Sequence, residues 1–291
     1  MQAVACGECY VANATNKYFN EKWILMIDEL LIKIYSLNNY LLTQNFKSII
    51  KKGDNMLELK DYTKIYPNNK VGADKVNLKV ESGDIFAFIG HNGAGKTTTI
   101  KSIVGINDIT SGDIIIDGVS IKENPILCKQ KIAYVPDNPD IYPALTGIQY
   151  INLVADFFKV NKKKREDLTK KYATELELIN DLNNQISTYS HGMRQKLVLI
   201  SAFIHEPKLL ILDEPFVGLD PKATYILKET MQNFVKNGGA IFFSTHVLDV
   251  AEKLCNKVAI IKDGKIIANG TMAEIKKDST LENVFLESEN V

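Results

Sequence analysis

The chain has 291 residues, 45% of them hydrophobic, which is enough to bury a sizeable core in one two-lobed domain or two small domains. Lys and Arg together number 35, as do Asp and Glu. The chain therefore has no excess of positive charge that would attract nucleic acid or an anionic membrane. No apolar run approaches the roughly 18 residues of a membrane-spanning helix. We therefore expect a globular protein whose membrane role, if it has one, depends on another chain.

Four cysteines are scattered along the chain, at Cys6, Cys9, Cys128 and Cys255, and form no disulfide framework. Cys6 and Cys9 make a lone C-x-x-C pair. A zinc site would need a second pair or suitably spaced histidines, and all four histidines lie far away in the sequence. Because the N-terminus also lacks the order of a secretory signal, we expect ordinary thiols in a reducing cytoplasm.

The first 55 residues differ from the rest, being rich in Asn and Lys, with amphipathic stretches at 21–35 and 39–50 that carry no motif. At Met56 the pattern changes to the alternation of a strand. Residues 51–55 can be encoded as a purine-rich ribosome-binding site before an ATG. We therefore expect residues 1–55 to be an N-terminal extension or upstream DNA read as protein, and 56–286 to be the functional domain.

Strand and helix patterns then alternate along the chain. Strands are expected at 57–62, 75–80, 84–89, 111–116 and 131–135, and again at 208–212, 240–244, 257–262 and 265–268. Helices are expected at 96–104, 147–159, 165–179 and 191–204, with the Lys-rich run 162–165 as a solvated helix entrance. Strands interrupted by one helical insertion predict an α/β core with a helical lobe at about 137–200.

The strand at 84–89 leads into a loop with the spacing G-x-x-x-x-G-K-[ST]. Glycines let backbone N–H groups wrap a triphosphate, and the following helix presents its positive N-terminus to the anion. Lys96 is expected to reach the β- and γ-phosphates, Thr97 to ligate Mg²⁺, and Thr98 to donate on the α-phosphate side. An accidental Gly-rich turn is the weaker interpretation, since a strand precedes the loop and a helix follows it. The predicted nucleotide-binding loop is Gly90, His91, Asn92, Gly93, Ala94, Gly95, Lys96, Thr97 and Thr98.

A second apolar strand, 209–212, ends in the acids Asp213 and Glu214. Asp213 at the strand tip can hold the Mg²⁺ shell, and Glu214 can orient or polarise a water for attack on the γ-phosphate. A surface turn after a buried strand is the alternative. That alternative is weak because a phosphate loop already requires such a partner.

Residues 189–195, Tyr-Ser-His-Gly-Met-Arg-Gln, resemble the signature of the ATP-binding cassette of ABC transporters, usually written L-S-G-G-Q. Ser190 and Gly192 match it, and the other three signature positions depart from it. In the family this Ser and Gly cap the γ-phosphate of ATP held by the opposite subunit, which places them at the cofactor site. Without the resemblance Ser190 would be an ordinary helix N-cap.

Further elements fall in the family's order. Residues 218–220 resemble its D-loop, and His246 resembles its switch histidine, which implies contact with the γ-phosphate and the attacking water. Tyr66 stands where the family places an adenine-stacking aromatic, although an aromatic there could also be core. Asp137 stands where the family usually has a Gln that contacts Mg²⁺ and water, and an acid can still act there through Mg²⁺.

The resemblance covers about 56–286 and implies a P-loop NTPase core with an antiparallel β subdomain and an inserted helical subdomain. It implies an ATPase that uses ATP and Mg²⁺, pairs with a second cassette when ATP is bound, and attaches to integral membrane permease subunits at the cytoplasmic face, with no nucleic acid partner. Residues 280–286 resemble the short ending of multidrug- and antibiotic-type exporters, which favours export.

Two other function classes remain as alternatives. A soluble cassette ATPase acting on ribosomes, DNA or Fe–S assembly would tend to carry paired cassettes, a long coiled-coil insertion or a basic surface, none of which this sequence shows. A phosphate-loop kinase would leave the Ser190 and His246 elements unexplained.

Overall fold

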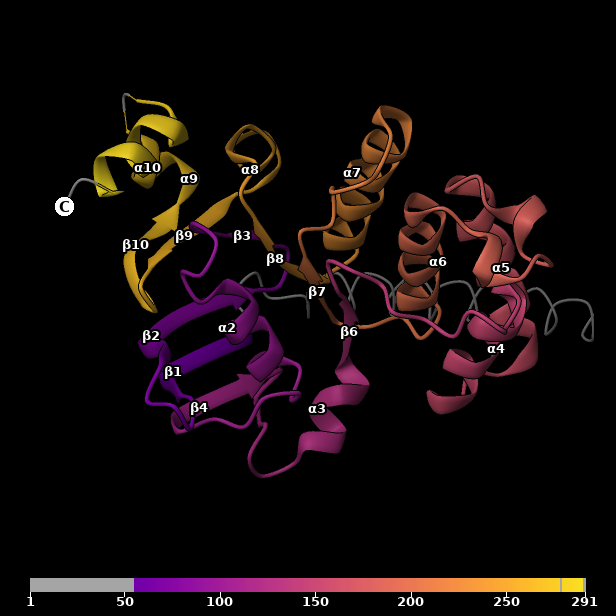
Figure 1. Cartoon of the computed structure of the whole chain (residues 1–291), viewed down its shortest axis with the longest axis horizontal. Helices are drawn as coiled ribbons and strands as arrows, with labels where there is room; N and C mark the ends of the chain where they lie inside the picture. Colours follow the sequence, from indigo (N-terminus) through magenta and orange to yellow (C-terminus); the bar gives the residue numbers. More distant parts are fainter. Residues whose placement is uncertain (1–54, 278, 290–291) are drawn as a thin grey trace, which may run out of the picture. The chain divides into compact units, whose positions relative to one another are not determined.

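The computed structural model describes residues 55–277 and 279–289, drawn in colour in Figure 1. The expectations for the N-terminal extension, including Cys6 and Cys9 and the two amphipathic stretches, lie outside the described residues. In the described part, two sheets and a set of helices place the predicted loop and acids on one edge of the larger sheet.

The smaller sheet is antiparallel and has four strands in the order β2-β1-β4-β5. Its strands are β1 (Asn55–Ile65), β2 (Val71–Glu81), β4 (Ser111–Ile116) and β5 (Val119–Ser120). β1 and β2 are longer than the sequence predicts because their pairing continues through irregularities near Asp61 and Lys75, both with a left-handed backbone (φ 46° and 48°). Such bulges break the two-residue alternation on which the prediction depended. The expected antiparallel β subdomain is confirmed.

The larger sheet has six strands in the order β10-β9-β3-β8-β7-β6. Its strands are β3 (Ile85–Ile89), β6 (Ile132–Val135), β7 (Leu209–Asp213), β8 (Ala240–Thr245), β9 (Lys257–Lys262) and β10 (Lys265–Thr271). Five run parallel, and only the edge strand β10 is antiparallel to its neighbour. Parallel strands end at the same edge, so the residues after β3, β6 and β7 lie close together.

Both faces of the larger sheet are buried. Along β3, Ile85, Ala87 and Ile89 face the core shared with the helices, whereas Phe86 and Phe88 face the core shared with the smaller sheet. In that second core the ring of Phe242 lies with its centroid 5.6 Å from that of Phe86 and 5.2 Å from that of Phe88. A sheet covered on both sides explains why its strands read as continuous apolar runs rather than as alternating ones.

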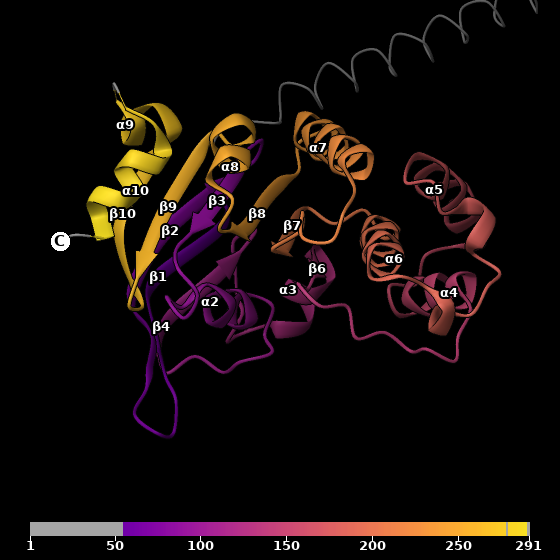
Figure 2. The same cartoon turned by 45° about the horizontal axis from the view of Figure 1, so that its top comes forward.

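The described helices are α2 (Lys96–Ile103), α3 (Pro125–Lys131), α4 (Gly147–Phe157), α5 (Lys162–Glu175), α6 (His191–Phe203), α7 (Pro221–Lys236), α8 (Leu248–Leu254), α9 (Met272–Lys276) and α10 (Leu281–Glu289). Two short 3₁₀ turns, Ile179–Asp181 and Ile186–Thr188, lie between α5 and α6. In Figures 1 and 2, α4, α5 and α6 gather on one side of the sheets, as the predicted helical lobe requires. None of the described helices is long and apolar enough to cross a membrane.

The sequence analysis misplaced α5 and missed α3, α7, α8, α9 and α10. The Lys-rich run is the first turn of α5 rather than its entrance, because Asn161 caps the helix by accepting a hydrogen bond from the Lys164 N–H at 2.9 Å. The helix ends at Glu175, four residues before the expected end, and Glu177 adopts a left-handed backbone there (φ 55°). α7 begins with an Asp220 cap and Pro221 in the first turn, a start signal that the sequence analysis did not use.

Candidate nucleotide-binding site

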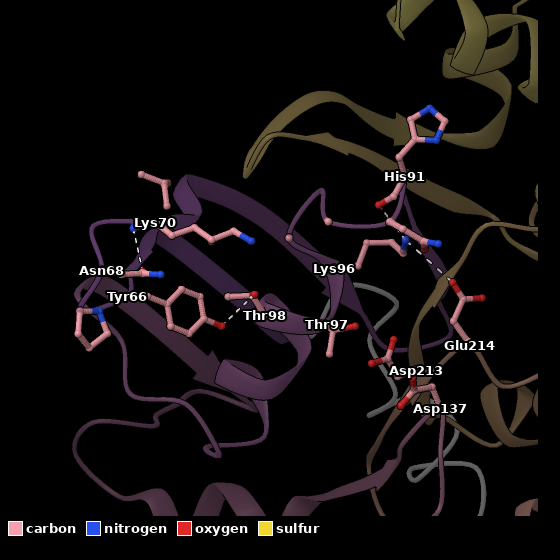
Figure 3. Close-up of a pocket in the computed structure, with 16 residues that line it drawn as sticks. Tyr66, Asn68, Lys70, His91, Lys96, Thr97, Thr98, Asp137, Asp213 and Glu214 are labelled. Carbon is pink, nitrogen blue, oxygen red and sulfur yellow. Dashed lines mark hydrogen bonds and ion pairs between the residues drawn. The ribbon is translucent and has the colours of Figure 1, made fainter.

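A cleft of about 620 Å³ lies where the predicted loop, the β1–β2 turn and the ends of β6 and β7 meet (Figure 3). Its lining comes from four separate parts of the chain, and most of the residues predicted from the sequence are in it. The lining residues are Tyr66, Pro67, Asn68, Lys70, Val71, Gly72, His91, Asn92, Gly93, Gly95, Lys96, Thr97, Thr98, Asp137, Asp213 and Glu214.

The loop takes its shape from two glycines. Gly93 and Gly95 have left-handed backbones, with φ of 87° and 112°, which side chains rarely allow. A Cβ on Gly95 would also lie 2.3 Å from the Gly72 carbonyl oxygen, so the smaller sheet approaches the loop as closely as backbone permits. Gly90 and Ala94, also predicted, are buried behind the loop and do not line the cleft.

Lys96, the first residue of α2, is 6% exposed at the base of the loop. Its ammonium donates to the carbonyl oxygens of Gly90 at 2.6 Å and His91 at 3.2 Å, and lies 4.0 Å from a carboxylate oxygen of Glu214. Burial lowers the pKa of Lys96, and the charges of Glu214 and Asp213 oppose that shift. A buried ammonium held chiefly by backbone carbonyls is suited to pair with an anionic ligand.

Asp213, at the end of β7, is 1% exposed. One carboxylate oxygen accepts a hydrogen bond from the Ser244 hydroxyl, whereas the other, Oδ2, is buried without a partner of normal hydrogen-bond geometry. Burial raises the pKa of Asp213; the Ser244 and Thr97 hydroxyls oppose this shift, and the charges of Asp137 and Glu214 add to it. An unpartnered buried carboxylate oxygen is costly, and a cation would remove that cost.

The donor set fits Mg²⁺ better than a metal caged by protein alone. In the described ranges, no three His, Cys, Asp or Glu side chains cluster as a metal-binding group. Mg²⁺ usually keeps waters and takes only one or two carboxylates together with substrate phosphates. Asp213, Asp137 and the Thr97 hydroxyl line the same cleft, which matches that pattern.

Glu214 and His246, the two predicted catalytic residues, are brought together by β7 and β8. The His246 Nδ1 lies 3.0 Å from a Glu214 carboxylate oxygen, and the Glu214 N–H donates to the Ser244 hydroxyl at 3.1 Å. Glu214 has a left-handed backbone (φ 48°), a strained conformation for a residue with a side chain. The His246 side chain is 58% exposed and lies beside the cleft rather than in its lining.

Tyr66 and Thr98 face each other across one end of the cleft (Figure 3). The Tyr66 hydroxyl lies 3.1 Å from the Thr98 hydroxyl, so in this structure Thr98 has a side-chain partner instead of an open hydroxyl. Asp137 also reaches the cleft, and one of its carboxylate oxygens accepts a hydrogen bond from the Asn138 N–H at 2.8 Å. The predicted base, phosphate and metal residues thus share one cavity.

Ser190 and Gly192 do not join this cleft. Ser190 is exposed and caps α6, accepting a hydrogen bond from the Met193 N–H at 3.2 Å. A Cβ on Gly192 would lie 2.9 Å from the Gly218 carbonyl oxygen, and one on Gly218 would lie 2.4 Å from the His191 ring. The signature-like segment therefore packs on the segment after β7, on the helical side of the chain and outside its own cleft.

The sequence analysis missed three polar residues of the site. Ser244 holds both Asp213 and the Glu214 backbone, but the sequence analysis treated it only as the last residue of the expected strand 240–244. Asn68 and Lys70 line the cleft from the β1–β2 turn. The polar run that follows Tyr66, Pro-Asn-Asn-Lys, was a detectable turn signal beside an expected base-binding aromatic.

Comparisons with known proteins agree with this geometry. A family model described as "ABC transporter" matches residues 73–217. The ABC-type transporter ATP-binding protein EcsA of Bacillus subtilis is 35% identical, over 80% of this chain and 96% of that protein. Nod factor export ATP-binding protein I of Cupriavidus metallidurans is 30% identical, over 76% and 72%. A solved structure of an ATP-binding subunit of an ABC transporter matches with a TM-score of 0.77 at 33% identity, over 80% of this chain and 99% of that one. The chain therefore belongs to the ABC transporter family, as an ATP-binding ATPase subunit.

Proposed function

We propose that this ATPase subunit powers export through separate integral membrane subunits, at the cytoplasmic face of the membrane. The observation that carries the ATP-dependent part is one cleft with a buried ammonium, Lys96, and a buried carboxylate oxygen without a partner, on Asp213. These are the charges that a metal-bound triphosphate complements. Export, of the multidrug or antibiotic type, is supported by the resemblance of residues 280–286 to such exporters and by a relative whose name is that of an export protein.

In this proposal the triphosphate lies against the loop N–H groups and the N-terminus of α2, and Lys96 pairs with the β- and γ-phosphates. Tyr66 stacks on the adenine at the other end of the cleft. Asn68 and Lys70 border the same end and add polar groups near the base and sugar.

Asp213, Thr97 and Asp137 would hold Mg²⁺. When bound, Mg²⁺ neutralises charge on the β- and γ-phosphate oxygens. The Asp213 Oδ2 atom then gains the partner that it lacks, and Asp137 adds a second carboxylate at the end of β6. An acid at this position, rather than the amide usual in the family, can keep the metal contact.

Glu214 is proposed to accept a hydrogen bond from the attacking water and so polarise it toward the γ-phosphate. His246 lies 3.0 Å from the Glu214 carboxylate and fixes its direction. Ser244 holds the Glu214 backbone N–H. His246 thus holds the Glu214 side chain, and Ser244 holds its backbone.

The second half of the site is proposed to come from another cassette. Ser190 and Gly192 stand at the exposed N-terminus of α6, where backbone N–H groups and the helix dipole favour an anion. Because these residues lie outside their own cleft, we infer that they close on the γ-phosphate held by the partner. Two ATP molecules would then hold two chains together.

The dimer test uses Glu214→Gln, which removes the water-polarising charge. Hydrolysis should slow by about 10²–10⁴-fold, so ATP accumulates and the protein should elute as a dimer in gel filtration with ATP and Mg²⁺. Adding Ser190→Arg should abolish the dimer while each monomer still binds nucleotide, because a bulky side chain then blocks the partner's phosphate. Ser187→Arg, at an exposed serine on the same lobe, is the matched control and should leave the dimer intact. A dimer that persists with Ser190→Arg would refute the shared site.

The transport part is tested by co-expression with a multi-span membrane protein encoded in a neighbouring reading frame. The chain should then be recovered in the membrane fraction, and ATP should drive substrate out of cells that carry both proteins. Recovery in the soluble fraction alone would favour the alternative of a cassette ATPase with a non-membrane partner.

A further inference from the structure

The tip of the phosphate loop contacts the C-terminal helix. The ring of His91 lies 4.9 Å from the ring of Phe285 in α10, centroid to centroid, at an angle of 56°. We propose that Phe285 is a positioning residue for ATP binding, which acts through His91 and makes α10 a support of the phosphate loop. This inference rests on the proposed binding of ATP in the cleft.

His91 connects α10 to the phosphate site because its ring and its backbone carbonyl make different contacts. Figure 3 shows its ring directed away from Lys96 and the cleft. Its carbonyl oxygen faces inward and accepts hydrogen bonds from the Lys96 ammonium at 3.2 Å and from the Ala94 N–H at 3.1 Å. A shift of the ring therefore moves an oxygen that holds both the loop and its lysine.

α10 is itself firmly attached. Its first residue, Leu281, is 0% exposed, and Phe285, one turn later, is 8% exposed. The Leu281 N–H donates to the Glu252 carboxylate at 2.9 Å, and the same carboxylate pairs with Lys276 of α9. Glu252 belongs to α8, which begins two residues after His246. The helix thus joins the phosphate loop to the segment that carries the switch histidine.

The loop needs support because its shape depends on glycine. Gly93 and Gly95 have left-handed backbones, and glycine loses more conformational freedom on ordering than any other residue. His91, Asn92 and Gly93 are all exposed, so burial does not hold the tip. An aromatic contact that keeps His91 in place reduces the ordering that ATP must otherwise impose, and preorganisation of this kind raises affinity.

The test measures ATP binding and turnover in Phe285→Ala and Phe285→Leu. Leucine fills most of the space of the buried phenylalanine ring, so the second variant serves if the alanine variant does not fold. Loss of an aromatic pair should weaken ATP binding by about 2- to 10-fold, with KM raised by a similar factor. At saturating ATP, kcat should stay within about twofold of wild type, since the chemical groups are unchanged. A merely structural role would instead lower kcat through loss of folded protein while leaving KM alone.

A double-mutant cycle shows whether the effect passes through His91. His91→Ala alone should weaken ATP binding as Phe285→Leu does, and the two together should lose no more than the larger single effect. Asn283→Ala, at an exposed site on the same helix, is the matched control and should bind ATP as the wild type does. The inference is overturned if Phe285→Leu binds ATP normally or if the two losses multiply. Failure of the wild type itself to bind ATP would instead overturn the proposed function.

Discussion

Asp213→Asn should make the nucleotide-free protein more stable, although it removes a residue of the site. Asp213 is 1% exposed, and its Oδ2 atom has no hydrogen-bond partner of normal geometry, so the folded chain buries a charge that is only partly compensated. An asparagine keeps an oxygen to accept from the Ser244 hydroxyl and removes the charge. The position of this carboxylate thus favours ligand binding and lowers the stability of the nucleotide-free protein.

The pH dependence has a definite sign. Because burial raises the pKa of Asp213, the folded chain keeps a proton on this carboxyl at pH values where the unfolded chain has lost it. The contribution of this group to stability therefore falls as the pH rises from the unfolded pKa through the raised folded pKa, and it stays low above that. Asp213→Asn has no carboxyl to ionise here, so at neutral pH the variant should not suffer this loss of stability.

Leaving a buried polar group unpaired costs about 1–3 kcal/mol, and more when the group is charged. The gain from removing the Asp213 charge is smaller than this full cost. Lys96 nearby already compensates part of the charge, and the amide that replaces the carboxylate is itself a buried polar group. We expect a net gain of about 1–2 kcal/mol. For a domain of this size that is roughly a 2–8 °C rise in Tm, which differential scanning calorimetry in EDTA would resolve. With Mg²⁺ and ATP at about 100 times Kd, the wild type gains about 2.7 kcal/mol and the order should reverse.

Asp84→Asn is the matched control because Asp84 is also buried, at 5% exposed, but is fully paired. It accepts from the Glu81 N–H and the Asn256 amide, each at 2.7 Å, and lies 2.9 Å from the Lys257 ammonium. This variant should lose stability. The reasoning is wrong if Asp213→Asn also lowers Tm in EDTA, or if Mg²⁺ and ATP raise its Tm as much as that of the wild type.

Three further outcomes are expected. Lys96→Ala should lose most ATP affinity, since the β- and γ-phosphates lose their charge partner; unchanged binding in an equilibrium titration would remove the phosphate-loop assignment. Thr146→Ala should destabilise the helical lobe by about 1 kcal/mol in urea unfolding, because Thr146 and Gln149 form a capping box at the start of α4; an unchanged midpoint would show that packing alone holds α4. Cys255 is buried and its thiol pKa is raised by burial, so thiol labelling followed by mass spectrometry should find it unmodified until the protein unfolds.

The sequence predicts those parts of the protein whose chemistry lies in neighbouring residues. The phosphate loop is a run of nine residues whose glycines, lysine and threonines act as one unit, and Asp213 and Glu214 adjoin at the end of a single strand. Continuous apolar runs also predicted the strands of the larger sheet, and apolar periodicity predicted the helical lobe. In each case the residues that must cooperate are adjacent along the chain, so their spacing alone identifies them.

Tertiary structure decided what depends on distant segments. Pairing of β7 with β8 brings Ser244 to Asp213 across 31 positions, and the packing of α2 against the smaller sheet sets the Tyr66 hydroxyl against Thr98. The contact of His91 with Phe285 joins a loop to a helix nearly two hundred residues away, and neither residue alone signals it. The bulges in β1 and β2 and the cap that starts α5 at Lys162 likewise depend on a backbone geometry that alternation does not reveal. Local spacing selects the chemistry, whereas the burial, pairing and support of those groups come from contacts that form only when the chain has folded.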